Sequence, residues 1–369
     1  MRIMKMRKTG LVLGIFLVSL LSIGGSSEFQ ITFDPDGQGN PAVYGDIVVW
    51  DDNRNGNDDI YGYNLSTGEE FQITTDENTQ ESPAIYKTIV VWGDHRNGNW
   101  DIYGYNLVTK EEFQITDNPF TQWEPAIYGD IVVWHDLRNG EGDIYGYNLS
   151  TGEEFRITTD WHIQRYPAIY GNIVVWEDHR HHDFDHNWDI YGYNLATKEE
   201  FPIAINEEDR NNPVIYEDIV IWDDCRNQNW DIYGYNLSTK EEFQITTGAN
   251  IEVHPAIYGN TVIWIDRTDI KALVYGYSLS KEEGFRLTSE EGNADLPAIY
   301  KNIVVWMDMR NGHGDIYGYD LSSSILAFQE GTSENEELDE SKNDGNGICL
   351  GTLFISLVLI GGLTFLMKG

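Results

Sequence analysis

The sequence predicts an all-β fold, a seven-bladed β-propeller with four-stranded blades. Three observations lead to this prediction: a tryptophan-centred phrase recurs seven times, each copy contains four strand signals, and a spare outer-strand phrase precedes the first copy. The recurring tryptophans are 42 residues apart, with one step of 46, and they are Trp50, Trp92, Trp134, Trp176, Trp222, Trp264 and Trp306.

The second copy, residues 83–116, illustrates the four strand signals. A short strand over Ala84–Tyr86 follows a proline, which suits the start of a strand. The β-branched and aromatic run Ile89–Trp92 is typical of a strand that is buried on both faces. Ile102–Leu107 is an aromatic-rich third strand, and Phe113–Thr116 alternates apolar with polar residues like a half-exposed outer strand.

The two ends of the repeat predict how the ring closes. The phrase Glu28–Thr32 has the outer-strand pattern, whereas the seventh copy ends at Leu321 without a clean equivalent. We therefore expect the N-terminal phrase to complete the last blade, three strands coming from one end of the chain and one from the other. A ring closed in this way leaves no free sheet edge. The predicted propeller spans residues 28–321.

The repeated motifs resemble those of a known group of propeller repeats. Pro-Ala-Ile-Tyr, Trp-x-Asp-x-Arg-Asn-Gly, Asp-Ile-Tyr and the outer Gln-Ile-Thr resemble the TolB-like propeller repeats of archaeal and bacterial surface proteins, over roughly residues 28–321. The resemblance implies an exported propeller. Seven copies and an apolar C-terminal segment depart from TolB itself, usually counted as six-bladed. The combination looks more like an archaeal cell-surface protein, by analogy alone.

The segments outside the repeat predict export and anchoring. Residues 1–27 have a basic start, an apolar run over Leu11–Ile23 and a small-residue end, the layout of a secretory signal peptide; an uncleaved anchor is the alternative. Residues 348–367 lack charge over a length that spans a bilayer as a helix, and Lys368 favours a cytoplasmic end. A sorting tail removed after export is the alternative for this segment. The acidic stretch 322–347 is expected to be a disordered linker.

The charge restricts the partners. The chain carries 61 Asp and Glu against 24 Lys and Arg, a formal net charge of −37, and five of the basic residues lie in the two terminal segments. Such a surface repels nucleic acid and attracts divalent cations and basic partners. With two cysteines there is no plausible intrachain disulfide framework.

Repeated Asp and Arg residues allow two interpretations. They could bind Ca²⁺ in most blades, since carboxylate and amide oxygens on a tight turn suit hard cations. They could instead form Asp–Arg pairs that brace each hairpin, which a feature present in most copies favours. The series are Asp52, Asp94, Asp136, Asp178, Asp224, Asp266 and Asp308, with Arg54, Arg96, Arg138, Arg180, Arg226 and Arg310, and Thr268 in the sixth blade.

Functional residues are sought where the copies differ. Blade four has a four-residue insertion and a cluster whose imidazole and carboxylate groups are candidate metal ligands: His179, His181, His182, Asp183, Asp185 and His186. Five tryptophans outside the repeat are candidates for stacking on a sugar or anchoring a protein: Trp100, Trp123, Trp161, Trp188 and Trp230. Three Asn-Leu-Ser sequons are candidate glycosylation sites, at Asn64, Asn148 and Asn236. For each set, ordinary packing or chance is the alternative.

The expected function is that of a membrane-anchored cell-surface propeller, a protein-interaction or structural scaffold. The alternative is a lectin-like binder of carbohydrate or glycoprotein. No nucleophile elbow, HExxH or phosphate-binding glycine loop stands out in the sequence, so an enzyme is not predicted, and a propeller hydrolase ranks third.

Overall fold

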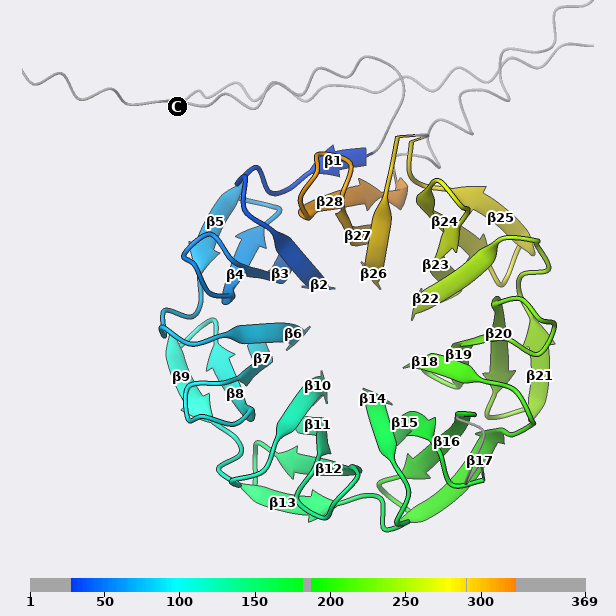
Figure 1. The fold of residues 1–369 in the computed structure, drawn as a ribbon, viewed down its shortest axis with the longest axis horizontal. Helices are drawn as coiled ribbons and strands as arrows, with labels where there is room; N and C mark the ends of the chain where they lie inside the picture. Colours follow the sequence, from blue (N-terminus) through cyan, green and yellow to red (C-terminus); the bar gives the residue numbers. More distant parts are fainter. Residues whose placement is uncertain (1–27, 182–186, 290, 323–369) are drawn as a thin grey trace, which may run out of the picture. The chain divides into compact units, whose positions relative to one another are not determined.

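The computed structural model describes residues 28–181, 187–289 and 291–322, and these form a ring of seven four-stranded antiparallel sheets (Figure 1). The predicted seven-bladed propeller of four-stranded blades is therefore confirmed. In these three ranges no helix is long and apolar enough to cross a membrane. The predicted signal peptide, linker and membrane anchor lie outside them, as do residues 182–186.

The strands occupy four concentric positions in the blades. The innermost are β2 (Gln38–Tyr44), β6 (Gln80–Tyr86), β10 (Gln122–Tyr128), β14 (Gln164–Tyr170), β18 (Arg210–Tyr216), β22 (Ile251–Tyr258) and β26 (Ala294–Tyr300). The second are β3 (Ile47–Asp52), β7 (Ile89–Asp94), β11 (Ile131–Asp136), β15 (Ile173–Asp178), β19 (Ile219–Asp224), β23 (Thr261–Arg267) and β27 (Ile303–Asp308).

The outer two positions complete each blade. The third strands are β4 (Asp59–Asn64), β8 (Asp101–Asn106), β12 (Asp143–Asn148), β16 (Asp189–Asn194), β20 (Asp231–Asn236), β24 (Ala272–Ser278) and β28 (Asp315–Asp320). The outermost are β5 (Glu69–Gln72), β9 (Glu111–Gln114), β13 (Glu153–Arg156), β17 (Glu199–Ala204), β21 (Glu241–Gln244), β25 (Glu283–Arg286) and β1 (Glu28–Gln30).

The first strand of each blade differs from its prediction. In the second blade β6 begins at Gln80, before Pro83, so the proline lies inside the strand instead of preceding it. The pairing of β6 with β7 shifts register between Glu81 and Ala84. The proline is tolerated because it sits in this β-bulge, where no ladder hydrogen bond is required of it.

The hydrophobic core lies between neighbouring blades. Trp92 is fully buried and packs with Val90 of its own blade against Val49 and Ile60 of the preceding one. Burial of each such side chain contributes on the order of 2 kcal/mol. The same contact recurs around the ring, which explains why a large aromatic residue returns once in every copy.

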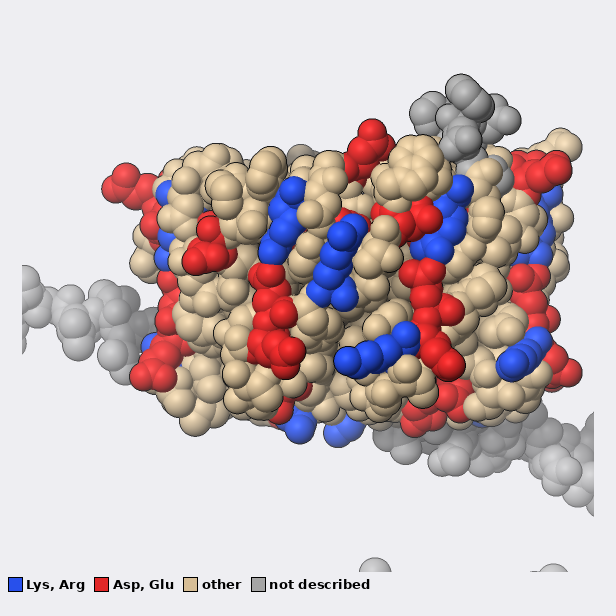
Figure 2. Space-filling view, turned by 90° about the horizontal axis from the view of Figure 1, so that it is seen from below, with Lys and Arg blue, Asp and Glu red and all other residues tan. Residues whose placement is uncertain are grey.

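The repeated Asp and Arg residues brace the blades. In the first blade Trp50 Nε1 donates a hydrogen bond to Asp52 at 2.9 Å, and Arg54 pairs with the same carboxylate at 2.5 Å. Arg54 also lies over the Tyr61 ring, 4.3 Å from its centroid, and reaches Glu70 on the outer strand at 2.6 Å. Six blades contain the Asp–Arg pair. On the outer wall, Figure 2 shows basic side chains set beside acidic ones.

The ring closes through the N-terminal strand, as predicted. β1 pairs with β28, and Phe29 lies opposite Gly318. Arg310 of the last blade pairs with Glu28 at 2.5 Å, the place that Glu70 takes in the first blade. A Cβ at Gly318 would lie 2.6 Å from the Phe29 ring, so only glycine fits beneath this phenylalanine. The closing strand thus reproduces the contacts of an ordinary outer strand.

A buried polar layer lies where each innermost strand begins. In the first four blades a glutamine there donates its side-chain N–H to the backbone carbonyl two residues earlier; these are Gln38, Gln80, Gln122 and Gln164. The fifth blade has Arg210 at this place and the sixth has Glu252, and both are buried. Burial, with Asp266 and Asp231 nearby, raises the pKa of Glu252 to about 8.

Replacing Glu252 by glutamine is expected to stabilise the propeller by about 2 kcal/mol at alkaline pH. Because the folded-state pKa lies above the ordinary value of 4.5, the folded protein holds this proton more tightly than the unfolded chain does. The stability that Glu252 contributes is thus fully present below 4.5 and is lost as the pH rises through about 8. A glutamine side chain does not titrate, and it supplies the same amide donor as the glutamines of the first four blades.

Urea unfolding of both proteins at pH 5 and pH 9 measures this effect. We expect Glu252→Gln to exceed the wild type clearly at pH 9 and to differ little from it at pH 5. An advantage of the same size at both pH values would contradict the assignment of the proton to Glu252.

Candidate binding site at the mouth of the central channel

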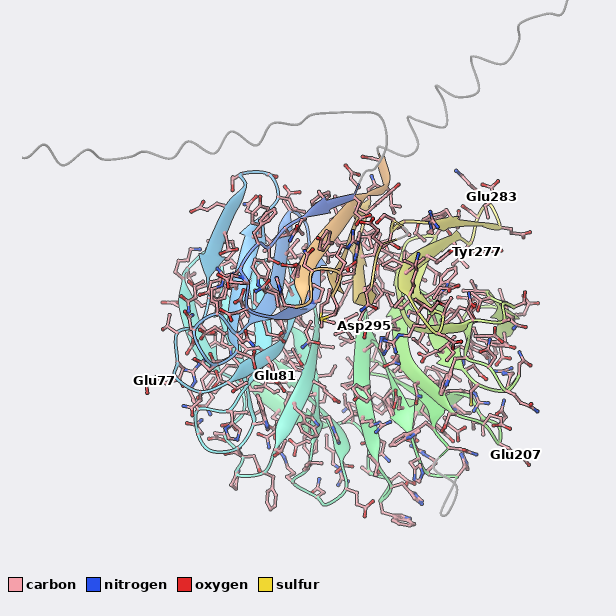
Figure 3. All side chains as sticks on the ribbon, turned by 45° about the horizontal axis from the view of Figure 1, so that its top comes forward. Glu77, Glu81, Glu207, Tyr277, Glu283 and Asp295 are labelled. Carbon is pink, nitrogen blue, oxygen red and sulfur yellow. The ribbon has the colours of Figure 1, made fainter. Side chains whose placement is uncertain are left out.

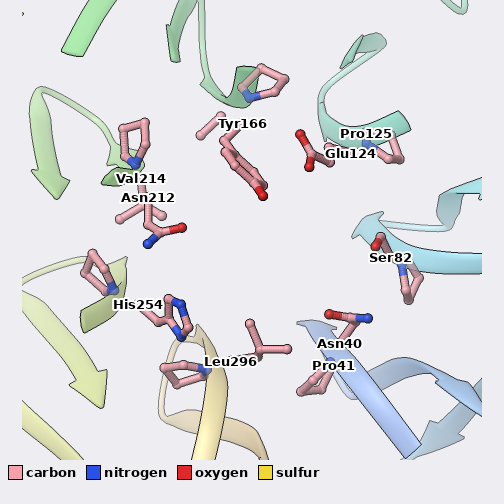
Figure 4. Close-up of a pocket in the computed structure, with 16 residues that line it drawn as sticks. Asn40, Pro41, Ser82, Glu124, Pro125, Tyr166, Asn212, Val214, His254 and Leu296 are labelled. Atoms are coloured by element: carbon pink, nitrogen blue, oxygen red, sulfur yellow. The ribbon is translucent and has the colours of Figure 1, made fainter. Parts of the chain in front are cut away.

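One residue in each blade is directed into the central channel by the β-bulge. It precedes the proline of the innermost strand and has a positive φ, from 46° to 57°. This backbone region is uncommon for residues other than glycine, so the bulge must impose it. Figure 4 shows these side chains around a shared central space. We call them the mouth ring: Asn40, Ser82, Glu124, Tyr166, Asn212, His254 and Leu296.

The mouth ring is chemically varied although the strands around it repeat. Two amides, a hydroxyl, a carboxyl, a phenol, an imidazole and an isobutyl group occupy equivalent positions. Together with the prolines that follow them they line a cavity of about 360 Å³. Small-molecule sites combine an apolar wall with a few convergent polar groups, as this cavity does.

The cavity opens at one face of the propeller. The interblade connections and the loops between second and third strands lie at this face, which we call the loop face, because each innermost strand starts there. At the other ends of the innermost strands the final tyrosines form a complete ring, with neighbouring centroids 4.3–5.0 Å apart. Burial and the adjacent phenols raise the pKa of Tyr86 to about 12. A ligand is therefore expected to enter from the loop face.

A second varied position supports the mouth ring from behind. It follows each recurring tryptophan and holds Asp51, Gly93, His135, Glu177, Asp223, Ile265 and Met307. The backbone N–H of Ser82 donates to Asp51 at 3.1 Å, and that of Asn212 donates to Glu177 at 2.7 Å. These carboxyls satisfy donors that the bulge removes from the ladder. Burial raises the pKa of Asp51 to about 6, and burial also raises the pKa of Glu177 above its ordinary value.

Blades three and four bring a titratable cluster to the mouth. Glu124 accepts a hydrogen bond from the Tyr166 backbone, and burial raises the pKa of Glu124 to about 7. His135 Nδ1 lies 3.8 Å from Glu124 and accepts a hydrogen bond from Trp123 Nε1. Burial lowers the pKa of His135 to about 4, so the imidazole is neutral near pH 7.

Arg165 is the nearest guanidinium to this cluster, and it already has partners. Its Nε donates to Glu177 at 2.8 Å, and its guanidinium carbon lies 3.6 Å from the Trp188 ring centroid. Among the described residues no arginine or lysine forms an ion pair with Glu124. Arg165 acts on the Glu124 carboxylate through space and favours its ionised form, but it pairs directly with Glu177.

The five candidate tryptophans do not form one patch. Trp123 contacts His135, and Trp188 stacks beneath Arg165, which places both beside the mouth. Trp100 is half-buried against His95, and Trp230 packs on the core between blades six and seven. Trp161 is 74% exposed in the connection before β14. Its role in ligand binding stays a prediction.

The histidine-rich insertion is described only in part. His179 contacts the Trp188 ring, and His181 Nδ1 lies 2.9 Å from Asp189. His182, Asp183, Asp185 and His186 fall outside the described residues. Among the residues that are described, no three His, Cys, Asp or Glu side chains are grouped so that they could hold a metal ion. The braced aspartates, which the calcium interpretation needed, already accept hydrogen bonds from tryptophan and arginine.

The sequon asparagines cap turns on the face opposite the loop face. Asn64 Oδ1 accepts hydrogen bonds from the backbones of Ser66 and Thr67, at 2.9 and 3.2 Å. Asn148 and Asn236 make the same contacts. Asn106 does so too, although no serine or threonine completes a sequon there. The turn geometry accounts for asparagine at this position, and glycosylation remains a prediction.

The loop face gathers the exposed apolar side chains. Of the nine large hydrophobic residues most exposed in the described ranges, eight lie on this face and only Val108, in the turn after β8, lies on the other. The eight are Phe33, Phe120, Trp161, Tyr166, Ile205, Ile251, Ile270 and Met309. Such a concentration marks an interaction surface more often than chance exposure.

The loop face is also acidic. None of the seven interblade connections contains lysine or arginine, whereas six contain Asp or Glu. Figure 3 shows Glu77 and Glu207 projecting at the rim, with Glu81 and Asp295 nearer the channel. The arginines of the braces lie at this face but are paired with carboxylates.

The candidate residues named from the sequence do not include the mouth ring. The available signal was the residue before each proline, which differs in almost every copy while its neighbours repeat. The prediction missed this residue because it placed the start of the innermost strand after the proline.

Comparison with known proteins establishes the fold alone. No family model matches the chain, and no curated protein sequence matches it. An oligogalacturonate lyase from Vibrio parahaemolyticus superposes with a TM-score of 0.63 at 14% identity, over 80% of this chain and 94% of the lyase. A puromycin-hydrolysing peptidase from Mycobacterium tuberculosis gives 0.63 at 11% identity, over 78% of this chain and 52% of the peptidase. TolB from Acinetobacter baumannii gives 0.49 at 17% identity, over 65% of this chain and 62% of TolB.

Proposed function

We propose that this protein is an exported, membrane-anchored cell-surface propeller that binds a partner protein through its loop face. The observation that carries the proposal is the placement of eight of the nine most exposed large apolar side chains on that face. Aromatic anchors such as Phe120 and Trp161 are the residue types that dominate binding energy in protein interfaces. The braced blades supply a rigid frame for them.

The charge of the loop face favours a basic partner. Its interblade connections contain Asp and Glu but no Lys or Arg, and the brace arginines are paired with carboxylates. Lys271, between β23 and β24, is a further basic residue on this face. A partner with lysine or arginine around an apolar centre would meet complementary potential, which speeds association and excludes acidic competitors. This requirement agrees with the repulsion of nucleic acid expected from the net charge of −37.

The proposed location rests on the two terminal segments. A basic and apolar start favours export, and the uncharged run 348–367 favours an anchor. Both ends of the propeller leave from the last blade, where β1 pairs with β28. A single tether following Leu321 would therefore hold the ring by one blade.

We propose a binding role and not a catalytic one. The fold is shared with lyases and peptidases at 10–14% identity, a level at which activity does not transfer. Carbohydrate binding is the second candidate, and the 74% exposure of Trp161 beside Asp160 and His162 favours it, because an exposed ring among polar groups suits stacking on a sugar.

The test is binding of the full chain to arrays of basic, apolar-containing peptides and of glycans. The wild type is expected to bind basic peptides, and the double variant Phe120→Ser with Trp161→Ser is expected to lose about tenfold in affinity or more. Val108→Ser removes an equally exposed apolar group from the opposite face and serves as the control. Equal loss in both variants contradicts the assignment to the loop face, and binding to glycans alone would favour the second candidate.

A further inference from the structure

We propose that the channel mouth takes up a cationic side chain, a guanidinium or ammonium group, between the carboxylate of Glu124 and the ring of Tyr166. The inference deepens the proposed function, since it assigns the group that a basic partner would insert. It concerns a separate site, because the exposed anchors Phe120 and Trp161 lie in the interblade connections and not in the mouth ring.

The cavity has the size and the access that such a group needs. It has a volume of about 360 Å³ and opens at the loop face, and the ring of tyrosines lies at the other ends of the innermost strands. Glu124 and Tyr166 stand on the adjacent strands β10 and β14, and both project into the shared space (Figure 4). The bulge fixes their backbones, so little ordering is required when a ligand binds.

The electrostatics at this part of the mouth select a cation. Glu124 is the only acid in the mouth ring, and Arg165 beside it is already held by Glu177 and the Trp188 ring. The neighbouring His135 accepts a hydrogen bond at Nδ1 from Trp123 and stays neutral. Tyr166, which is 41% exposed, adds an aromatic ring of the kind that attracts guanidinium and ammonium groups, and Arg165 already lies over this ring, 5.1 Å from its centroid.

Glu124 also has a structural role, which must be distinguished from its proposed role in binding a cation. In two other blades an acid behind the mouth ring accepts the N–H of the next ring residue, as Asp51 does for Ser82. In the third blade that place is taken by His135, and Glu124 itself accepts the N–H of Tyr166. Glutamine keeps the oxygen that accepts this bond and removes only the charge. Glu124→Gln therefore isolates the charge from the structural contact.

The inference includes a pH dependence. A cation requires the ionised form of Glu124, whose pKa is about 7 because of burial and the nearby Glu177. The other groups that face it are the Arg165 guanidinium, which lowers the pKa of Glu124, and Tyr166 and His135, which stay neutral near pH 7. Affinity for a cation should thus rise between pH 6 and pH 8.

The experiment is calorimetric titration of the full chain with N-acetyl-argininamide and with its neutral isostere N-acetyl-citrullinamide, at pH 6, 7 and 8. We expect the arginine probe to bind at pH 8 at least about tenfold more tightly than the citrulline probe, and to weaken as the pH falls. Glu124→Gln should abolish both the preference and the pH dependence, and Tyr166→Leu should weaken binding. Glu283→Gln, which removes an exposed carboxylate from the outer strand of blade six, should leave both unchanged.

Several outcomes would overturn the inference: no saturable binding of the arginine probe at pH 8, equal binding of both probes, or an unchanged preference in Glu124→Gln. Circular dichroism and thermal melting of each variant show whether it is folded. If peptides bind the loop face and lose affinity in the Phe120→Ser, Trp161→Ser variant while the arginine probe does not bind, the proposed function stands and only the channel site is wrong.

Discussion

Replacing Arg210 by alanine is expected to lower the free energy of unfolding by about 3–5 kcal/mol. Arg210 is fully buried at the start of β18, and its guanidinium lies 3.2 Å from Asp189 and 3.1 Å from Asp224. Both carboxylates are also fully buried, so the alanine variant removes a buried positive charge that they share and leaves a cavity in its place. Urea unfolding followed by tryptophan fluorescence measures the loss.

Arg210→Gln is the matched control, because four other blades have glutamine at this place. Its amide can donate to the Glu208 carbonyl, which Arg210 now contacts at 2.9 Å. Asp224 retains Arg226 and Trp222, and Asp189 retains His181. We expect the glutamine variant to lose less than half as much as alanine, because it keeps a donor and most of the volume. Equal losses would show that the positive charge, which both variants lack, determines the effect.

Deletion of residues 28–32 is expected to cost about 4 kcal/mol or more and to cause association. The deletion removes the ladder between β1 and β28, the buried Ile31 and the Phe29 ring that covers Gly318. It also exposes β28 as a free edge in the last blade. Unfolding in urea measures the stability, and light scattering measures the association.

The variant Glu28→Gln serves as a control that distinguishes the loss of the closing strand from the loss of the Glu28 charge. It removes the ion pair with Arg310 and leaves the strand and its apolar contacts in place. Since Arg310 is still paired with Asp308, we expect a loss of about 1 kcal/mol or less. A deletion variant that remained monomeric with an unchanged unfolding midpoint would contradict closure through the N-terminal strand.

Much of the fold could be predicted because the repeat is local and nearly invariant. The spacing of the buried tryptophans determined the blade count, and the spare phrase at Glu28 determined the closure. The Asp–Arg pairs were the favoured interpretation of a feature found in six copies, and all six are present. The strand boundaries were less accurate, because a proline inside a strand is compatible only with an edge or a bulge, and a bulge has no clear sequence signal.

The candidate site was harder to predict from the sequence than the fold was. The residues that differ between copies were sought among histidines and tryptophans, whose chemistry is conspicuous. Glu124 and Tyr166 are separated by 42 positions in the sequence and occupy equivalent places in two blades. Nothing local indicates that both side chains point into one cavity, or that Arg165 is already paired with Glu177.

The sequence by itself therefore determined the number of blades, the way the ring closes and the acidic character of the surface, since these depend on periodicity and composition. Only the tertiary structure decided which varied residues meet. The bulge directs one side chain per blade toward the axis, and closure brings seven distant positions around a single cavity. Burial then sets the charge state of Glu124, because the ionised form loses hydration there and the nearby Arg165 offsets only part of that loss.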